Sequence, residues 1–317
     1  MSKDFRIIFM GTPEFAVPSL SILIENGYHI AGVITASDKP AGRGRNTQES
    51  AVKQYAKSQN LTILQPTNLK DEVFIEELQA LNGNLQIVVA FRMLPEVVWQ
   101  MPEFGTFNLH ASLLPNYRGA APINWAIING EKTTGITTFY INERIDTGDI
   151  LMQEEVDIGP HDSAGTLHDS LQIKGATLVL STVQGIANDS LEEQSQNDNG
   201  ENGLKPAPKI YKEDCKLDWS QDADQLFNKI RGLSPYPGAW TILVDNDGNE
   251  QSLKIFEAEL SDNMLLVGSI ETDNSSYLLV GTSNGSIALK SVQLAGKKRN
   301  SIADFLRGFD LDKKWRF

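Results

Sequence analysis

The fold of this chain is constrained most by short, mainly apolar runs that alternate with segments of helical periodicity. Three of these runs cover Arg6–Met10, Ile30–Thr35 and Leu85–Ala90. Their β-branched content and short length predict strands that are buried on both faces. An amphipathic stretch at Phe15–Asn26, which Gly27 ends, lies between the first two runs. This alternation predicts an α/β domain with a Rossmann-like, parallel, doubly wound sheet.

The same part of the chain contains further segments of both kinds. Short apolar patterns predict strands at Leu61–Leu64, Phe107–His110, Gly135–Ile141 and Asp149–Val156. Helical periodicity predicts helices at Ala51–Ser58, Asp71–Leu81, Ile123–Ile128 and Ser163–Gln184, with Gly175 as a candidate break in the last. In the second helix we expect the core positions to be Val73, Ile75, Leu78 and Leu81. The polar segment Ser37–Glu49 predicts a long flexible loop.

The remainder of the chain has a different pattern. Asn188–Gly203 is acidic, polar and free of aromatic residues, which is typical of a linker or an exposed loop. Beyond Pro237, alternating patterns predict short strands at Ala239–Val244, Leu253–Leu260, Tyr277–Gly281 and Ser286–Val292. Asp245–Asn249 is a hairpin signal, and helices are expected at Ala223–Arg231 and Ile302–Arg307. We therefore expect a first domain at residues 1–188, a linker at 189–208 and a small β-barrel domain at 209–317.

Composition restricts the possible partners. The formal net charge of −13 and the pI of about 4.8 argue against nucleic-acid binding, because phosphate contacts need basic groups. Basic residues nevertheless gather at 43–45 and 297–299; such runs are usually solvated, yet a local basic surface on an acidic protein can hold RNA. The chain lacks an apolar run of about eighteen residues, so we expect no membrane span. The single cysteine, Cys215, excludes a disulfide framework and fits a reducing cytoplasm.

Three polar residues form the best candidate for a catalytic site. Asn108 and His110 lie two apart at the end of a predicted strand, so their side chains share one face. An amide donor beside an imidazole suits a carbonyl oxygen that becomes negative on attack, and Asp146 nearby would orient the ring. The spacing alone fits structural polar groups equally well, because Asp-Thr-Gly-Asp is also an ordinary turn. The other histidines lack metal-ligand spacing, so we expect no metal.

The residues around this candidate site carry a resemblance. The stretch from Asn108 to Pro122 reads NLHASLLPNYRGAAP, and Asp146-Thr147-Gly148-Asp149 follows it. Together with GTPEFA at residues 11–16 and PAGRGR at residues 40–45, it resembles the folate-dependent formyltransferases over nearly the whole chain. The resemblance implies an OB-like C-terminal barrel. It also implies formyl transfer from 10-formyltetrahydrofolate to the amino group of methionyl initiator tRNA, by a cytoplasmic monomer.

The resemblance also implies roles for individual residues. Asn108 and His110 would stabilise the oxyanion, with Asp146 orienting His110. The implied folate-binding residues are Phe91, Met93, Leu94, Ser112, Leu113, Leu114 and Pro115. The implied tRNA-binding residues are Arg43 and Arg45.

Several alternatives remain open. Phe91 and Leu94 can instead be core residues, which is the commoner role of apolar residues after a central strand. Arg118 is either an anion ligand or a structural link. The chain can instead formylate a small amine, hydrolyse the same folate, or bind RNA without catalysis.

Overall fold

The computed structural model describes residues 4–41, 46–196, 203–309, 315 and 317, and the chain divides into two compact units. Unit 1 comprises residues 1–119, 133–157 and 168–206, and unit 2 comprises residues 120–132, 158–167 and 207–317. Each unit is therefore assembled from three separate segments of the chain. Helix α6 (Ala164–Ala187) begins in unit 2 and continues in unit 1.

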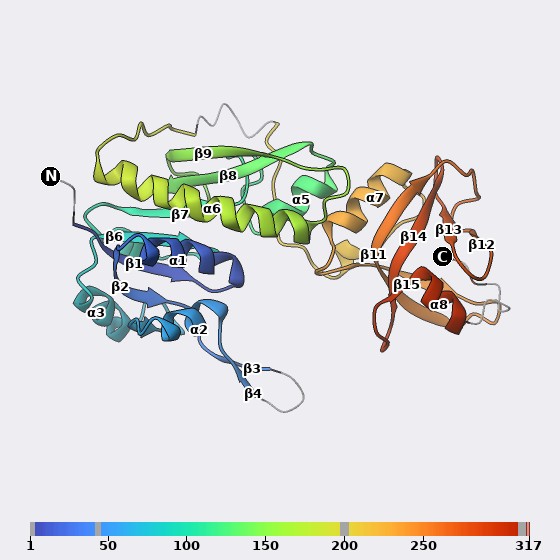
Figure 1. Cartoon of the computed structure of the whole chain (residues 1–317), viewed down its shortest axis with the longest axis horizontal. Helices are drawn as coiled ribbons and strands as arrows, with labels where there is room; N and C mark the ends of the chain where they lie inside the picture. The colour runs from blue at the N-terminus through green and yellow to red at the C-terminus, as the bar shows by residue number, and fades with distance from the viewer. Residues whose placement is uncertain (1–3, 42–45, 197–202, 310–314, 316) are drawn as a thin grey trace. The chain divides into compact units, whose positions relative to one another are not determined.

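Unit 1 contains a seven-stranded sheet in the order β5-β2-β1-β6-β7-β8-β9 (Figure 1). The first five strands of that order run parallel, whereas β8 is antiparallel to β7 and β9 is antiparallel to β8. The strand bounds are β1 Arg6–Gly11, β2 His29–Ile34, β5 Ile63–Leu64, β6 Leu85–Val89, β7 Thr106–His110, β8 Thr133–Tyr140 and β9 Ile150–Asp157. The predicted Rossmann-like sheet is confirmed, with two antiparallel strands added at one edge.

Helices cover both faces of this sheet. Besides α6, they are η1 Glu14–Ala16, α1 Val17–Glu25, α2 Ala51–Ser58, α3 Glu72–Ala80 and α4 Glu96–Trp99. One face carries Met10 and Val88, which form a cluster with Phe74 of α3 and Val98 of α4. The other face carries Leu109, against which α6 packs closely at Gly175. Because side chains alternate along β7, Asn108 and His110 point to the face opposite Leu109.

Three expectations about unit 1 are corrected. Val73 is 64% exposed, while Phe74 and Leu78 are buried, because these two lie four residues apart on the inner side of α3. Gly175 does not break α6; its missing side chain leaves room for Leu109, whose Cδ2 would lie 2.7 Å from an added Cβ.

The third correction concerns the segment Ser37–Glu49. It forms a two-stranded antiparallel hairpin of β3 (Lys39–Ala41) and β4 (Asn46–Gln48) instead of a loop. The backbone hydrogen bonds of the hairpin give this polar sequence a regular structure. Arg43 and Arg45 lie outside the described residues.

Unit 2 is built on a six-stranded antiparallel sheet in the order β10-β11-β14-β13-β12, with β15 paired to β14. The bounds are β10 Ala239–Val244, β11 Glu250–Ser261, β12 Ile270–Thr272, β13 Leu278–Gly281, β14 Ser286–Leu294 and β15 Asn300–Ser301. Its helices are α5 Pro122–Ile128, η2 Glu213–Cys215, α7 Ala223–Gly232 and α8 Ile302–Gly308. This arrangement agrees with the predicted small β-barrel, although β12 and β15 were not expected.

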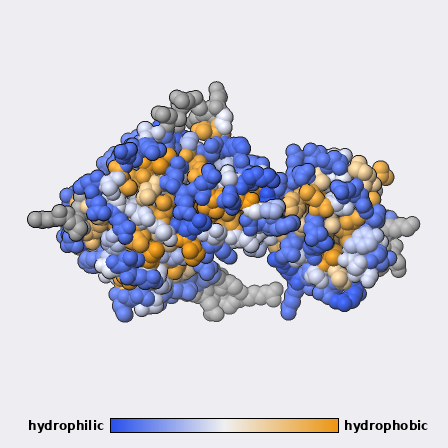
Figure 2. All heavy atoms as spheres, turned by 45° about the horizontal axis from the view of Figure 1, so that its top comes forward, coloured by the Kyte–Doolittle hydropathy of each residue, from blue (hydrophilic) through white to orange (hydrophobic). Residues whose placement is uncertain are grey.

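The interior of unit 2 and its first hairpin turn follow from the sequence pattern. Leu226 and Ile230 of α7 are buried in one cluster with Leu253 and other strand residues. The hairpin at 245–249 is confirmed, since the Asp245 amide donates to the Asn249 carbonyl between β10 and β11. Most side chains at the surface shown in Figure 2 are hydrophilic, as expected for a chain that has buried its apolar residues in two cores.

Candidate functional site

Strand β7 carries two of the three candidate catalytic side chains. It lies between β6 and β8, and Asn108 is paired with Val88 on one side and Phe139 on the other. His110 ends the strand and is 6% exposed, and its ring makes a T-shaped contact with that of Phe139. The carboxyl ends of parallel strands are where open α/β sheets bind ligands. The fold therefore places both side chains where chemistry is expected.

The hydrogen bond of His110 defines which ring nitrogen is available. Its Nε2 lies 2.8 Å from the Tyr117 carbonyl oxygen, which can only accept a hydrogen bond. Nε2 therefore carries a hydrogen, and in the neutral ring Nδ1 is the basic nitrogen. Nδ1 lies 3.7 Å from Asp146 Oδ2, which is close enough for an ion pair but longer than a hydrogen bond. The ring is thus anchored by Tyr117 and faces Asp146.

Asp146 reaches the site from the connection between β8 and β9. Its φ of +54° lies in the left-handed region, which an aspartate adopts more readily than most residues. Its Oδ2 accepts a hydrogen bond of 2.9 Å from the Gly119 amide. Two residues later, a Cβ on Gly148 would lie 1.6 Å from the Tyr140 carbonyl oxygen, so only glycine fits there. The connection is therefore tightly folded.

The predicted folate residues after β7 are held against the sheet. Thr137 on β8 donates to the Ser112 carbonyl and accepts from the Leu114 amide. Gln153 on β9 donates to the Leu114 carbonyl. Ser112 is fully buried, and its hydroxyl donates to the Asn116 carbonyl. Leu114 is buried in a cluster with Phe139 and Ile150, and Leu113 packs closely against Gly135. Pro115, half-buried, follows Leu114 in the same loop.

The predicted folate residues after β6 differ from one another in burial. Leu94 is 5% exposed and belongs to the cluster that contains Met10 and Val88. Phe91 is half-buried and packs against this cluster. Met93 is 67% exposed. The stretch therefore offers apolar surface at the carboxyl end of β6, while Leu94 itself contributes to the core.

The sequence did not indicate one residue that lies at this site. Gln196, from the segment predicted to be a linker, is 8% exposed. Its Nε2 donates to the carbonyls of Asp146 and Gly148, and its Oε1 accepts from Arg118 Nε and Nη2. Arg118 is thus bound to a side chain of its own unit. Nothing in a polar, acidic stretch distinguishes a glutamine that will be buried from one that stays solvated.

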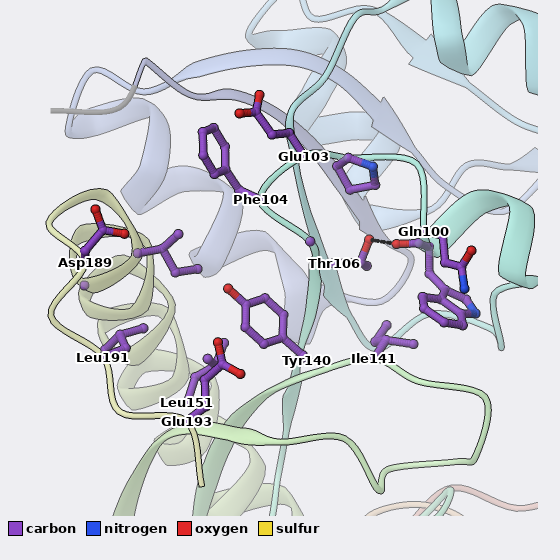
Figure 3. Close-up of a pocket in the computed structure, with 15 residues that line it drawn as sticks. Gln100, Glu103, Phe104, Thr106, Tyr140, Ile141, Leu151, Asp189, Leu191 and Glu193 are labelled. Atoms are coloured by element: carbon purple, nitrogen blue, oxygen red, sulfur yellow. Dashed lines mark hydrogen bonds between the residues drawn. The ribbon is translucent and has the colours of Figure 1, made fainter. Parts of the chain in front are cut away.

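A pocket of about 630 Å³ lies at the other end of β7. Thr106, the first residue of that strand, lines it, together with Phe104, Tyr140 and Glu193. Figure 3 shows Phe104, Tyr140 and Glu193 among the side chains that line it. Since His110 ends the same strand, this pocket is separate from the Asn108, His110 and Asp146 site.

Two features do not occur in the parts of the chain that the structure describes. There, no group of three or more His, Cys, Asp or Glu side chains converges as metal ligands would. Among the same residues, no helix is long and apolar enough to cross a membrane.

Family comparisons match both parts of the sequence. Residues 5–183 match the model described as formyl transferase, and residues 209–310 match that of its C-terminal domain. The chain is 56% identical to the methionyl-tRNA formyltransferase of Flavobacterium johnsoniae over 96% of each chain. It is 54% identical to the methionyl-tRNA formyltransferase of Parabacteroides distasonis, over 97% of this chain and 96% of the relative.

Solved structures with low sequence identity share the fold. The sugar 3N-formyl transferase WlaRD, solved with dTDP and 5-N-formyl-THF, superposes with a TM-score of 0.66 at 21% identity, over 93% of this chain and all of WlaRD. HypX from Aquifex aeolicus, in complex with tetrahydrofolic acid, gives a TM-score of 0.63 at 17% identity, over 96% of this chain and 47% of HypX. At such identities these structures show a common architecture.

Proposed function

Since this chain belongs to the formyl transferase family, we propose that it transfers the formyl group of 10-formyltetrahydrofolate to the amino group of methionyl initiator tRNA. The observation that carries this conclusion is identity above half, over nearly the full length, to methionyl-tRNA formyltransferases. The products are formylmethionyl-tRNA, which serves translation initiation, and tetrahydrofolate. We propose that the protein acts in the cytoplasm, where initiator tRNA is used, and that it acts as a monomer.

Asn108, His110 and Asp146 are proposed to carry out the transfer. The acceptor amine attacks the formyl carbon, and Asn108 and the protonated His110 stabilise the negative charge that develops on the formyl oxygen. The bond between that carbon and the folate nitrogen then breaks. Since His110 Nε2 is bound to Tyr117, we assign the proton given to the leaving nitrogen to Nδ1. Asp146, 3.7 Å from Nδ1, assists in removing the proton that the amine loses, through a water molecule.

The folate is proposed to bind at the carboxyl ends of β6 and β7. Bound 10-formyltetrahydrofolate supplies the formyl carbon. The exposed Met93 and the half-buried Phe91 give a flat ring an apolar surface there. Leu94 supports this surface from the core, and residues 112–115 form the neighbouring wall.

The tRNA is proposed to contact residues 209–317 together with Arg43 and Arg45, while residues 1–188 carry the catalysis and 189–208 join the two. Unit 2 offers cations beside an aromatic ring: Lys212 and Lys216 lie 5.7 and 5.8 Å from the centre of the Trp240 ring. A ring flanked by cations is a common platform for a nucleic-acid base and its phosphate. These local charges are compatible with a net charge of −13.

The decisive experiment is formylation by purified protein with 10-formyltetrahydrofolate. The acceptors are charged initiator methionyl-tRNA, the same tRNA uncharged, and a panel of small amines. We expect product only with the charged tRNA. Formylation of a small amine alone would refute the assigned acceptor, and release of formate without any acceptor would identify a hydrolase.

A further inference from the structure

A short segment after α6 is ordered by pairing with the sheet. Gln194 exchanges two backbone hydrogen bonds with Ile150 at the start of β9, of 2.8 and 2.9 Å. The side chains of Gln194 and Ser195 are exposed, but Gln196 is buried. Backbone pairing at the edge of the sheet thus brings the amide side chain of Gln196 into the interior of unit 1.

All the hydrogen-bonding capacity of the Gln196 side chain is used. Its Nε2 donates to the Gly148 carbonyl at 2.7 Å and to the Asp146 carbonyl at 3.1 Å. Its Oε1 accepts from Arg118 Nη2 at 2.7 Å and from Nε at 3.1 Å. An amide has two donor hydrogens and two acceptor lone pairs, so each is satisfied. A side chain bound in this way has little freedom to move.

These bonds complete a ring of contacts behind the catalytic pair. Asp146 is bound through its backbone to Gln196 and through its carboxylate to the Gly119 amide. The residue before Gly119, Arg118, is bound to Gln196 in turn. The residue before that, Tyr117, holds His110 through its carbonyl. Besides the direct bond from the Gly119 amide, the two loops that fix His110 and Asp146 are therefore cross-linked by the Gln196 side chain.

The conformation of Asp146 explains why a cross-link is needed. A φ of +54° is less favourable for aspartate than extended or helical backbone, so surrounding contacts must hold it. We propose that Gln196 is a positioning residue that fixes the backbone of Asp146, and with it the distance between its carboxylate and His110. The inference rests on the proposed function, because it takes these two side chains to act in formyl transfer.

Two variants of Gln196 and one control test this. Gln196→Leu removes all four hydrogen bonds, and Gln196→Glu keeps acceptor oxygens for Arg118 while it removes the donors to Asp146 and Gly148. We expect both to lower kcat about ten- to a hundredfold with KM for methionyl-tRNA nearly unchanged, since small misplacements of catalytic groups have effects of this size. Gln194→Leu, an exposed neighbour whose bonds are made by its backbone, should match the wild type.

A second measurement does not depend on activity. The Gly119 amide donates to Asp146, so loss of the cross-link should speed its hydrogen exchange, measured by NMR, in both Gln196 variants but not in Gln194→Leu. If the wild-type protein formylated no tRNA, the proposed function would be wrong. Hydrogen exchange at the Gly119 amide would still test whether Gln196 positions Asp146. Normal kcat in Gln196→Glu, or unchanged exchange at Gly119 in both variants, would overturn the inference.

Discussion

A single backbone carbonyl determines much of the chemistry available at the site. Tyr117, at φ +61°, turns its carbonyl towards His110 and so fixes which ring nitrogen holds a hydrogen. The pattern Asn108-x-His110 indicated that a donor and an acid–base group share one face. It gave no information about Tyr117, because a backbone contact depends on a loop conformation that periodicity does not encode.

Loss of the amide at Asn108 should slow the reaction. We expect Asn108→Ala to reduce kcat about a hundred- to a thousandfold, because removing one donor to a developing oxyanion has an effect of that order. The thermal midpoint should change little, since Asn108 is only half-buried. Single-turnover formylation measures the rate, with Asn263→Ala, an exposed loop residue of unit 2, as the control. A rate within threefold of the wild type (roughly 0.6 kcal/mol) would contradict this role.

The only cysteine should be unreactive while the protein is folded. Cys215 is 1% exposed, and its Sγ donates to the Tyr211 carbonyl. Burial raises the pKa of the Cys215 thiol, which lowers the thiolate fraction at a given pH. Iodoacetamide at pH 8 should therefore modify the native protein far more slowly than the protein in guanidinium chloride. Equal rates by mass spectrometry would show that the thiol is accessible.

At the scale of helices and strands, the sequence pattern was informative wherever apolar periodicity was strong. The expected bounds of α2 and β10 are those observed. Prediction failed where polar residues form regular structure, as in the hairpin of β3 and β4. It failed again at Gln196, because a buried polar side chain is selected by its hydrogen-bond partners and those come from distant parts of the chain.

The hairpin of β3 and β4 is anchored at both ends by one lysine. Lys53 on α2 lies 2.5 Å from Asp38, before β3, and 3.3 Å from Glu49, after β4. We expect Lys53→Met to loosen the hairpin and to raise KM for tRNA severalfold with little change in kcat. Steady-state kinetics measure this, and Lys70→Met, an exposed lysine of unit 1, is the control.

The same anchor should weaken in acid. Hydrogen bonds from Gln65 and Lys53 lower the pKa of Asp38, and the bond from Lys57 lowers the pKa of Glu49. Carboxyls whose pKa is lowered by folding stabilise the native state above their ordinary pKa of about 4 and lose that effect as the pH falls through the folded pKa. Proteolysis within the hairpin should therefore accelerate below about pH 4 in the wild type.

The connection that carries Asp146 should not tolerate a side chain at Gly148. An added Cβ would lie 1.6 Å from the Tyr140 carbonyl oxygen, so the backbone must move. We expect Gly148→Ala to abolish turnover and to lower the thermal midpoint by several degrees, as measured by activity and circular dichroism. Gly308→Ala, where an added Cβ meets nothing within 4 Å, should be neutral. A fully active Gly148→Ala variant would contradict the view that the connection between β8 and β9 is tightly constrained.

For the whole molecule, the proposed function requires an acidic chain to bind an acidic nucleic acid. If phosphates are contacted by a few lysines and arginines, the affinity for tRNA should fall about tenfold or more between 50 and 200 mM salt. Filter binding of initiator tRNA measures this. Lys216→Ala should reduce the slope of log affinity against log salt by about one unit, whereas Lys70→Ala in unit 1 should leave it unchanged. Affinity independent of salt would contradict the proposed tRNA contact.

Unit 2 is built from separate segments of the chain, and this affects the order in which the protein can fold on the ribosome. Helix α5 packs against α7, where the Asn124 side chain donates to the Gly232 carbonyl and Ile128 fills the space that a Gly232 side chain would need. Residues 129–222 separate the two helices. Translation of that stretch takes roughly 5–20 s at ordinary elongation rates. During this interval α5 has been synthesised without its native partner, so a nascent-chain chaperone has its clearest opportunity to bind before α7 emerges.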